Sequence, residues 1–396
     1  MITKSDLELL KTEEIRDQID LNIERIHTDV ALDKSLCHSA LVATQVKYLQ
    51  RAKSKLPHYF EARCIIPSRA FEQSSSEATA CSKPISGESV LELTCGLGVD
   101  AMALSKRFKR VVTLERDEIL AEVAKENFKR LGIESIEVIN SSAEEFLEQC
   151  EERFDWIYVD PDRRGADGKK KVLLEDCSPN ILALDADLKR VADNLAVKCS
   201  PIFDVDEAFR IYAGSRVEVV SVGDECKEVN IYINRCGEQK EMIGALAVGK
   251  GEVWVNKGDE HYPTLLQSLD YKLFSHLIIP DVSLQKSRLA RKILGEICLI
   301  ESDNGYGFST PEAMAKFDAT RHLARIEQID SILEYEPKKA RKELATRAIT
   351  RAEILKRESP YSVAQITKQL KISEGGKQKI AVTKLKNRLI IIILAQ

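Results

Sequence analysis

The residues best suited to chemistry are a glycine-rich turn and the acidic side chains around it. Residues 90–101 read VLELTCGLGVDA, an apolar stretch that leads into Gly96 and Gly98 and then into a helical pattern. Glycine is favoured in such a turn because it adopts backbone angles that other residues resist, and because it lets a ligand approach the main chain closely. The pattern predicts that a nucleotide-like cofactor binds at this turn.

Taken alone, the turn fits two kinds of cofactor. Gly96, Gly98 and Ala101 match the G-x-G-x-x-A spacing of dinucleotide sites. Glu92, inside the preceding strand, instead favours a ligand with a cationic group, such as the amino group of a methionine moiety. Glu115 ends the next predicted strand and can accept hydrogen bonds from both ribose hydroxyls of either cofactor.

A second polar cluster, Asp160-Pro161-Asp162-Arg163-Arg164, follows the fourth predicted strand. Ligands of open α/β sheets bind at the carboxyl ends of the strands, so this cluster belongs to the same predicted site. The carboxylate of Asp160 can accept hydrogen bonds from a ligand at such a site. Arg163 and Arg164 could hold a phosphate or brace Asp160, or they could only form salt bridges within the fold.

Alternating strand and helix patterns surround these motifs and predict an α/β fold. The pattern indicates a Rossmann-like, doubly wound sheet of mostly parallel strands, with an antiparallel hairpin over 216–222 and 229–234 at its edge. The expected strands are 89–94, 111–114, 136–139, 156–159 and 196–199, and the expected helices are 101–108, 119–131, 144–149 and 182–194.

The flanking regions differ from this core. Residues 1–85 are predicted to be helical, with an N-cap at Ser5-Asp6 and a long helix over 41–56. Two further hairpins are expected after the core, over 245–255 and 380–394. The predicted domains are a helical segment over 1–85, the α/β core over 86–240, and two small α+β domains over 241–335 and 336–396.

In this order and spacing, the motif E-x-x-x-G-x-G, the acidic end of the second strand and the D-P pair resemble class I S-adenosylmethionine-dependent methyltransferases. The polar segment 72–80 and the tail 354–361, ILKRESPY, extend the likeness to a bacterial group of these enzymes. That group has a helical N-terminus, a methyltransferase core, a ferredoxin-like domain and a THUMP-like C-terminal domain. The resemblance implies an RNA substrate, either rRNA or tRNA, because THUMP domains are associated with RNA-modifying enzymes.

The resemblance also implies roles for single residues. Glu92 would bind the amino group of S-adenosylmethionine, Glu115 its ribose, and Ser142 its adenine, where many relatives have an aspartate. Ser75–Thr79 would correspond to the helix that lines the cofactor ahead of the core. The implied cofactor-binding residues are Ser75, Thr79, Glu92, Thr94, Gly96, Gly98, Asp100, Glu115, Arg116, Ser142 and Ala143, and the implied catalytic residues are Asp160, Pro161 and Arg163.

The expected reaction is methylation of a base nitrogen of RNA, and several alternatives remain, methylation of DNA or of protein among them. The chain could bind S-adenosylmethionine and RNA without turnover, or it could be a nicotinamide-dependent oxidoreductase that uses the glycine turn. Methylation of uridine at C5 would need a cysteine nucleophile. Cys177, Cys199 and Cys226 follow the core motifs, but no recognisable motif surrounds them, and this chemistry is disfavoured.

Composition bears on the expected partners of the protein and on its cellular compartment. Residues 337–388 hold 15 Lys or Arg against four Glu, whereas the whole chain carries a net charge of -4, so a basic segment follows an acidic body and favours a polyanionic partner. The ten cysteines include no C-x-x-C pair, which indicates reduced thiols in the cytoplasm. No apolar run is long enough for a membrane span, and the scattered histidines predict no metal site.

Overall fold

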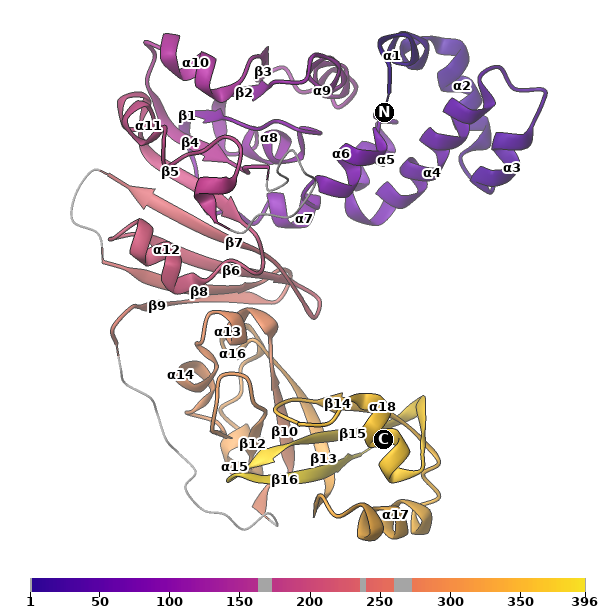
Figure 1. Cartoon of the computed structure of the whole chain (residues 1–396), viewed down its shortest axis with the longest axis vertical. Helices are drawn as coiled ribbons and strands as arrows, with labels where there is room; N and C mark the ends of the chain where they lie inside the picture. The colour runs from indigo at the N-terminus through magenta and orange to yellow at the C-terminus, as the bar shows by residue number, and fades with distance from the viewer. Residues whose placement is uncertain (1, 163–172, 236–239, 260–272, 396) are drawn as a thin grey trace. The chain divides into compact units, whose positions relative to one another are not determined.

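The computed structural model describes residues 2–162, 173–235, 240–259 and 273–395 (Figure 1). The chain forms two compact units, and each is described by itself. The first comprises Met1–Ser215 and Val229–Gln239, and the second comprises Arg216–Glu228 and Lys240–Gln396. The finer division into four domains stays a prediction.

The first unit begins with helices that precede the sheet (Figure 1). The helix expected over 41–56 is confirmed as α4, which buries Val42, Val46 and Leu49 at helical spacing. The N-cap expected at Ser5-Asp6 is wrong, because Thr3 caps the first helix and the Asp6 side chain accepts a hydrogen bond from the Thr3 backbone in a capping box. These helices are α1 (Lys4–Lys11), α2 (Glu13–Asn22), α3 (His27–Leu32), α4 (Ser39–Lys55), α5 (Pro57–Glu61), α6 (Ser68–Gln73) and α7 (Glu77–Ala80).

The sheet of the first unit confirms the predicted α/β architecture. Its strands run in the order β3-β2-β1-β4-β5-β7, and all neighbours are parallel except β5 and β7. The chain order reverses at β1, between β2 and β4, which is where open sheets of this kind form a ligand crevice. The strands are β1 (Gly87–Glu92), β2 (Phe108–Glu115), β3 (Ile136–Asn140), β4 (Phe154–Val159), β5 (Ala192–Cys199) and β7 (Glu225–Asn234).

Helices connect these strands, and two of them are shorter than the sequence predicts. The helix expected over 101–108 ends earlier because Phe108 begins β2 and pairs with Gly87. The helix expected over 182–194 ends earlier because Ala192 begins β5 and pairs with Phe154. In both places, ladder pairing overrides local helix propensity. The helices are α8 (Val99–Leu104), α9 (Glu118–Arg130), α10 (Ala143–Gln149), α11 (Asp185–Val191) and α12 (Val205–Ile211), with a 3₁₀ turn at Leu174–Asp176.

The second unit contains a strand group formed by β6 (Arg216–Val222), β8 (Met242–Ala247) and β9 (Gly251–Asn256). β8 and β9 pair antiparallel, which confirms the hairpin expected over 245–255. The short helices of this unit are α13 (Val282–Lys286), α14 (Ala290–Leu294), α15 (Pro311–Met314) and α16 (Ala319–His322).

A seven-stranded sheet completes the second unit, in the order β11-β12-β10-β13-β16-β15-β14. β15 and β16 form the expected C-terminal hairpin, with Lys386 and Asn387 in the left-handed conformation at its turn. β13 pairs with both β10 and β16, so the strand before residue 335 and the basic segment share one sheet. The elements are β10 (His276–Pro280), β11 (Leu299–Ile300), β12 (Gly307–Ser309), β13 (Ala324–Glu334), β14 (Arg351–Lys356), β15 (Ser373–Leu385) and β16 (Arg388–Leu394), with α17 (Pro337–Thr346) and α18 (Val363–Leu370).

Within the ranges that the structure describes, no helix has both the length and the apolar character that a membrane span requires.

Candidate active site

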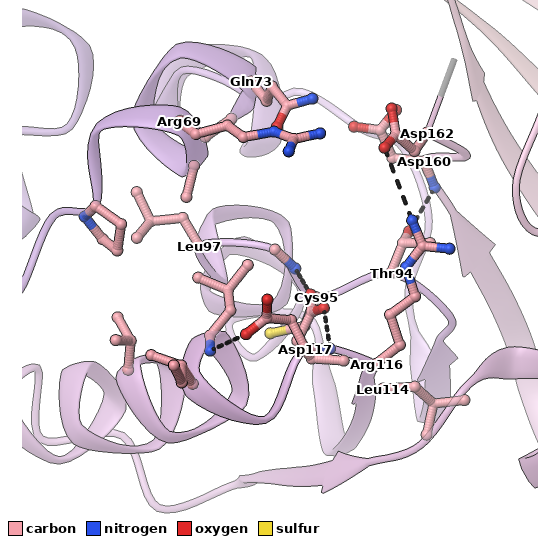
Figure 2. Close-up of a pocket in the computed structure, with 18 of the residues that line it drawn as sticks. Arg69, Gln73, Thr94, Cys95, Leu97, Leu114, Arg116, Asp117, Asp160 and Asp162 are labelled. Carbon is pink, nitrogen blue, oxygen red and sulfur yellow. Dashed lines mark hydrogen bonds and ion pairs between the residues drawn. The ribbon is translucent and has the colours of Figure 1, made fainter. Parts of the chain in front are cut away.

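A cavity of about 830 Å³ opens at the carboxyl ends of β1, β2, β3 and β4 and is bordered by α6 and by the N-terminal residues Ile2–Lys4 (Figure 2). It lies at the strand-order reversal, where the sequence places the site. The structure brings ten of the predicted residues together on its wall: Ser75, Thr94, Gly96, Asp100, Glu115, Arg116, Ser142, Ala143, Asp160 and Pro161. Arg163 and Arg164 lie outside the described residues.

The two glycines of the turn have different roles. Both have positive φ, 56° at Gly96 and 86° at Gly98. A Cβ on Gly96 would meet no atom within 4 Å, so this position leaves the main chain open to the cavity. A Cβ on Gly98 would lie 2.6 Å from the ring of Phe128, and Gly98 does not line the cavity. Gly98 is therefore required by packing, whereas Gly96 leaves room for a ligand.

Glu115 joins the two loops beside the cavity. Its Oε2 accepts a hydrogen bond from the Gly96 amide at 2.9 Å, and its Oε1 accepts one from the Asp117 amide, also at 2.9 Å. Burial raises the pKa of Glu115, and these two amides partly offset the increase. Each carboxylate oxygen has a second lone pair, so Glu115 can still accept hydrogen bonds from a ligand.

Glu92 lies behind the cavity wall and not on it. Its side chain is fully buried, its Oε2 accepts a hydrogen bond from Thr113, and its Oε1 has no hydrogen-bond partner among the described residues. Burial and the nearby Asp100 raise the pKa of Glu92 well above its ordinary value. The structure thus separates Glu92 from the surface that a ligand would touch, contrary to the direct binding expected from sequence.

Two other predicted cofactor residues have structural hydrogen bonds. Thr79 is buried, does not line the cavity, and donates its hydroxyl proton to the carbonyl of Ser76 at the start of α7. Ser142 does line the cavity, but its hydroxyl forms a capping box with Glu145 at the start of α10. The Ser142 position is therefore explained by helix capping, and its role toward adenine stays a prediction.

A buried network of charges beneath the cavity was not predicted from sequence. Lys83 Nζ lies 2.8 Å from Asp100 Oδ1, and Ser75 donates its hydroxyl proton to Asp100 Oδ2. Lys198 Nζ lies 2.6 Å from Asp160 Oδ2 and 2.8 Å from the Ser75 hydroxyl. Burial alone would raise the pKa of Asp100, but Lys83 and Lys198 lower it well below its ordinary value.

The two lysines of this network carry only a weak sequence signal. Lys198 stands in the apolar β5 near its carboxyl end, and its side chain is 10% exposed. Lys83 precedes a proline in a loop, and its side chain is 2% exposed. A lysine inside an apolar strand, at the sheet edge where ligands bind, could have been recognised because buried lysines need a partner.

Asp160 is held from two sides. Its backbone amide donates to the Thr94 hydroxyl at 2.9 Å, which joins the ends of β1 and β4, and Lys198 binds its carboxylate. Figure 2 shows Arg69 and Gln73 extending from α6 toward the side of the cavity that carries Asp160 and Asp162. The site thus offers a fixed carboxylate on one wall and a guanidinium and an amide on the other.

The cysteines considered for nucleophilic chemistry do not reach the cavity. Cys177 and Cys199 are buried, and neither lines it; Cys226 belongs to the second unit, and burial raises its pKa to about 11. Cys95 does line the cavity, but burial, followed by the nearby Glu92, raises its pKa well above the ordinary value. A nucleophilic cysteine must be a thiolate at the substrate, so the raised pKa of Cys95 and the positions of Cys177 and Cys199 away from the cavity wall disfavour this attack.

Two segments of the chain match known protein families. Residues 70–174 match the family described as conserved hypothetical protein 95, and residues 324–396 match the family described as THUMP domain-like. A 23S rRNA (uracil(1939)-C(5))-methyltransferase of Vibrio parahaemolyticus is 29% identical over 162 residues, which cover 37% of this chain and 36% of that relative. A tRNA/tmRNA (uracil-C(5))-methyltransferase of Vibrio vulnificus is 30% identical over 136 residues, which cover 28% of this chain and 37% of that relative.

The chain therefore spans little more than a third of these curated relatives. A crystal structure from Porphyromonas gingivalis W83, described as a candidate methyltransferase, is similar over 100% of this chain and 99% of that chain, with a TM-score of 0.81 and 22% identity. At that identity the likeness concerns the fold. The chain thus shares the fold of that structure, and its residues 70–174 and 324–396 are similar to the conserved hypothetical protein 95 and THUMP domain-like families.

Proposed function

We propose that this protein is an S-adenosylmethionine-dependent methyltransferase that acts on a base nitrogen of rRNA or tRNA in the cytoplasm. The observation that carries the proposal is the cavity at the strand-order reversal, which has an open glycine turn on one side and the fixed carboxylate of Asp160 on the other. The direct test is transfer of labelled methyl groups from S-adenosylmethionine to total RNA, followed by identification of the methylated nucleoside.

The residues present fit the cofactor. The cavity, at about 830 Å³, lies within the range of roughly 300–1,000 Å³ that small-molecule sites occupy. Gly96 would receive the methionine side because nothing fills the space above it, and Glu115 would accept the ribose hydroxyls. When bound, S-adenosylmethionine supplies an already activated methyl group, so the protein needs only to align the acceptor and exclude water.

Asp160 would orient the acceptor nitrogen. An exocyclic amine presents N–H groups to a carboxylate, and a hydrogen bond from one of them fixes the direction of the nitrogen lone pair. Lys198 binds Oδ2 of Asp160, and a carboxylate has about four lone-pair sites, so it can accept from the lysine and from a substrate at the same time. Lys198 is therefore a positioning residue that prevents the Asp160 side chain from rotating away.

Methylation of uracil at C5 is the second candidate, and the names of the curated relatives favour it. It requires a thiolate that adds to the ring, and the described residues place no activated thiol at the cavity. RNA that contains 5-fluorouracil distinguishes the two reactions, because C5 chemistry would trap a covalent protein–RNA adduct. We expect no adduct by mass spectrometry, and a stable adduct would replace the amine proposal with the C5 reaction.

Glu115→Gln is expected to weaken S-adenosylmethionine binding by about 10- to 100-fold. The amide loses the charge that strengthens hydrogen bonds to the ribose, and charge-assisted bonds are worth about 1.5–3 kcal/mol each. Isothermal titration measures the affinity. Glu118→Gln is the matched control because Glu118 is exposed and makes a surface ion pair with Lys4. Absence of micromolar binding by the unaltered protein would refute the cofactor proposal.

The basic segment is expected to bind the RNA phosphates. Lys338, Lys339 and Lys342 are exposed on α17, whereas Arg341 donates to the carbonyl of Gln369 and is left in place. Replacing the three lysines with glutamine should weaken RNA binding and reduce the slope of log affinity against log salt by about 0.7–0.9 for each phosphate that is no longer neutralised. Fluorescence anisotropy at several salt concentrations measures this slope. The affinity for S-adenosylmethionine should not change in this variant. An unchanged slope would mean that α17 does not contact the RNA.

A further inference from the structure

The second unit contains a separate cleft of about 490 Å³ that the proposed methyl transfer does not use. It is formed where the ends of β10 and β14 meet the start of β13 and the turn before β9. The tail motif 354–361, which contributes to the family resemblance in sequence, supplies Lys356 and Arg357 to this cleft. The motif therefore lines a cavity as well as completing a strand.

Arg357 is the unusual residue of the cleft. Its guanidinium lies over the ring of Tyr306, 4.8 Å from the centroid, and donates hydrogen bonds to the carbonyls of Gly305 and Pro280. A guanidinium has five N–H groups, so three remain without an acceptor among the described residues. No carboxylate of the described residues forms an ion pair with Arg357, although a half-buried charge without a counter-ion is costly.

The carboxylates of the cleft are paired with other cations and do not neutralise Arg357. Arg325 forms an ion pair with the exposed Asp224 at 3.1 Å. Lys250 lies 3.1 Å from Asp281 Oδ2, while Asp281 Oδ1 accepts from the hydroxyls of Ser221 and Ser283. Two carboxylates are thus matched by two cations.

Lys356 and Arg357 are the cations in excess of this balance. Burial lowers the pKa of Arg357, and the nearby Arg325 lowers it further, while Tyr306, Asp224 and Asp281 raise it in part. Arg325 and Arg357 both line the cleft, so an anion bound in it would lie near both guanidiniums.

We propose that this cleft is a phosphate-binding site, in which Arg357 and Arg325 hold one phosphate group. The guanidinium fork matches phosphate oxygens in geometry as well as in charge. Resting on the proposed function, the source is a phosphodiester of the RNA substrate, which the cleft would anchor while a base enters the cavity of the first unit. A free phosphate ion would satisfy the same chemistry, and the experiment separates the two sources.

The test compares Arg357→Gln and Arg325→Gln, alone and together, in the full-length chain. Lys316→Gln is the matched control because Lys316 is an exposed lysine of the same unit outside the cleft. For the double variant we expect RNA affinity to fall about tenfold or more at low salt, and the salt slope to decrease by about 0.7–0.9, as expected for one phosphate. Arg357→Lys should restore part of the slope, since it keeps the charge but loses the fork.

Titration with inorganic phosphate, with and without bound RNA, identifies the source. Phosphate binding that RNA prevents assigns the cleft to an RNA phosphodiester, and binding that RNA does not affect assigns it to a free phosphate. The proposal is overturned if Arg357→Gln and Arg325→Gln, with unchanged circular dichroism, alter neither RNA binding nor phosphate binding. S-adenosylmethionine titration of the same samples reports on the proposed function independently, because a failed cofactor site would leave the phosphate result intact.

Discussion

Asp160→Asn is expected to lower the kcat of methyl transfer by about 10²- to 10³-fold while leaving the affinity for S-adenosylmethionine within a few-fold of the unaltered protein. The asparagine keeps the shape of the side chain but removes the charge that binds Lys198 and that, in the proposed function, would bind the substrate amine. Removing one preorganised hydrogen bond to a reacting group typically costs about this much in rate. Single-turnover transfer of labelled methyl groups, with enzyme in excess over RNA, measures the chemical step.

Asp162→Asn is the matched control for this experiment. Asp162 lines the same cavity two residues later and forms an ion pair with Arg116 at 3.9 Å, whereas Lys198 binds the carboxylate of Asp160. We expect this variant to keep most of its activity. If Asp160→Asn transfers methyl groups at the normal rate, or if both variants lose activity equally, Asp160 does not orient the acceptor nitrogen.

Lys83→Met is expected to lower the free energy of unfolding by about 3–5 kcal/mol, which is the usual cost of leaving a buried charge without its partner. Lys83 and Asp100 form an ion pair whose side chains are 2% and 10% exposed. Without Lys83, Lys198 remains near the Asp100 carboxylate, with its Nζ 4.0 Å from Oδ2. Urea denaturation followed by circular dichroism measures the change.

Two further variants make this stability prediction specific. Lys109→Met removes an ion pair with Glu88 in which both side chains are more than 70% exposed, and it should change stability by less than about 1 kcal/mol. Adding Asp100→Asn to Lys83→Met should recover part of the stability, because the uncompensated charge disappears. If Lys83→Met lowers the free energy of unfolding by less than about 1 kcal/mol, water reaches Asp100 and the ion pair is not buried from solvent.

The pattern of the sequence predicted the core sheet well because burial imposes a strong periodicity. The five expected parallel strands are all present as β1 to β5, and the turn at Lys386-Asn387 closes the expected C-terminal hairpin. Helix ends were less predictable. Phe108 and Ala192 lie at the ends of segments whose sequence favours a helix. Each belongs to a strand because it pairs with a residue of a neighbouring strand, Gly87 and Phe154 respectively. Local sequence does not show which strand will lie beside it.

The candidate site was predictable only in part. Turn glycines and carboxylates at strand ends can be recognised from sequence, and ten of the predicted residues do line one cavity. Glu92 and Gly98 have the expected residue types, yet the structure places them behind the wall. One strand or turn presents some positions to the ligand and others to the core, and residue type alone does not separate these two environments.

The sequence by itself determined the strand pattern, the glycine turn and the acidic residues at the sheet edge, since each depends on neighbours in the chain. Only the tertiary structure decided which charges meet. Lys198 is distant in sequence from Asp160 and Ser75, and Arg325 from Arg357, yet the members of each group lie together in the fold. Electrostatic energy depends on distance and burial, and both are set by how the strands assemble rather than by the order of the residues.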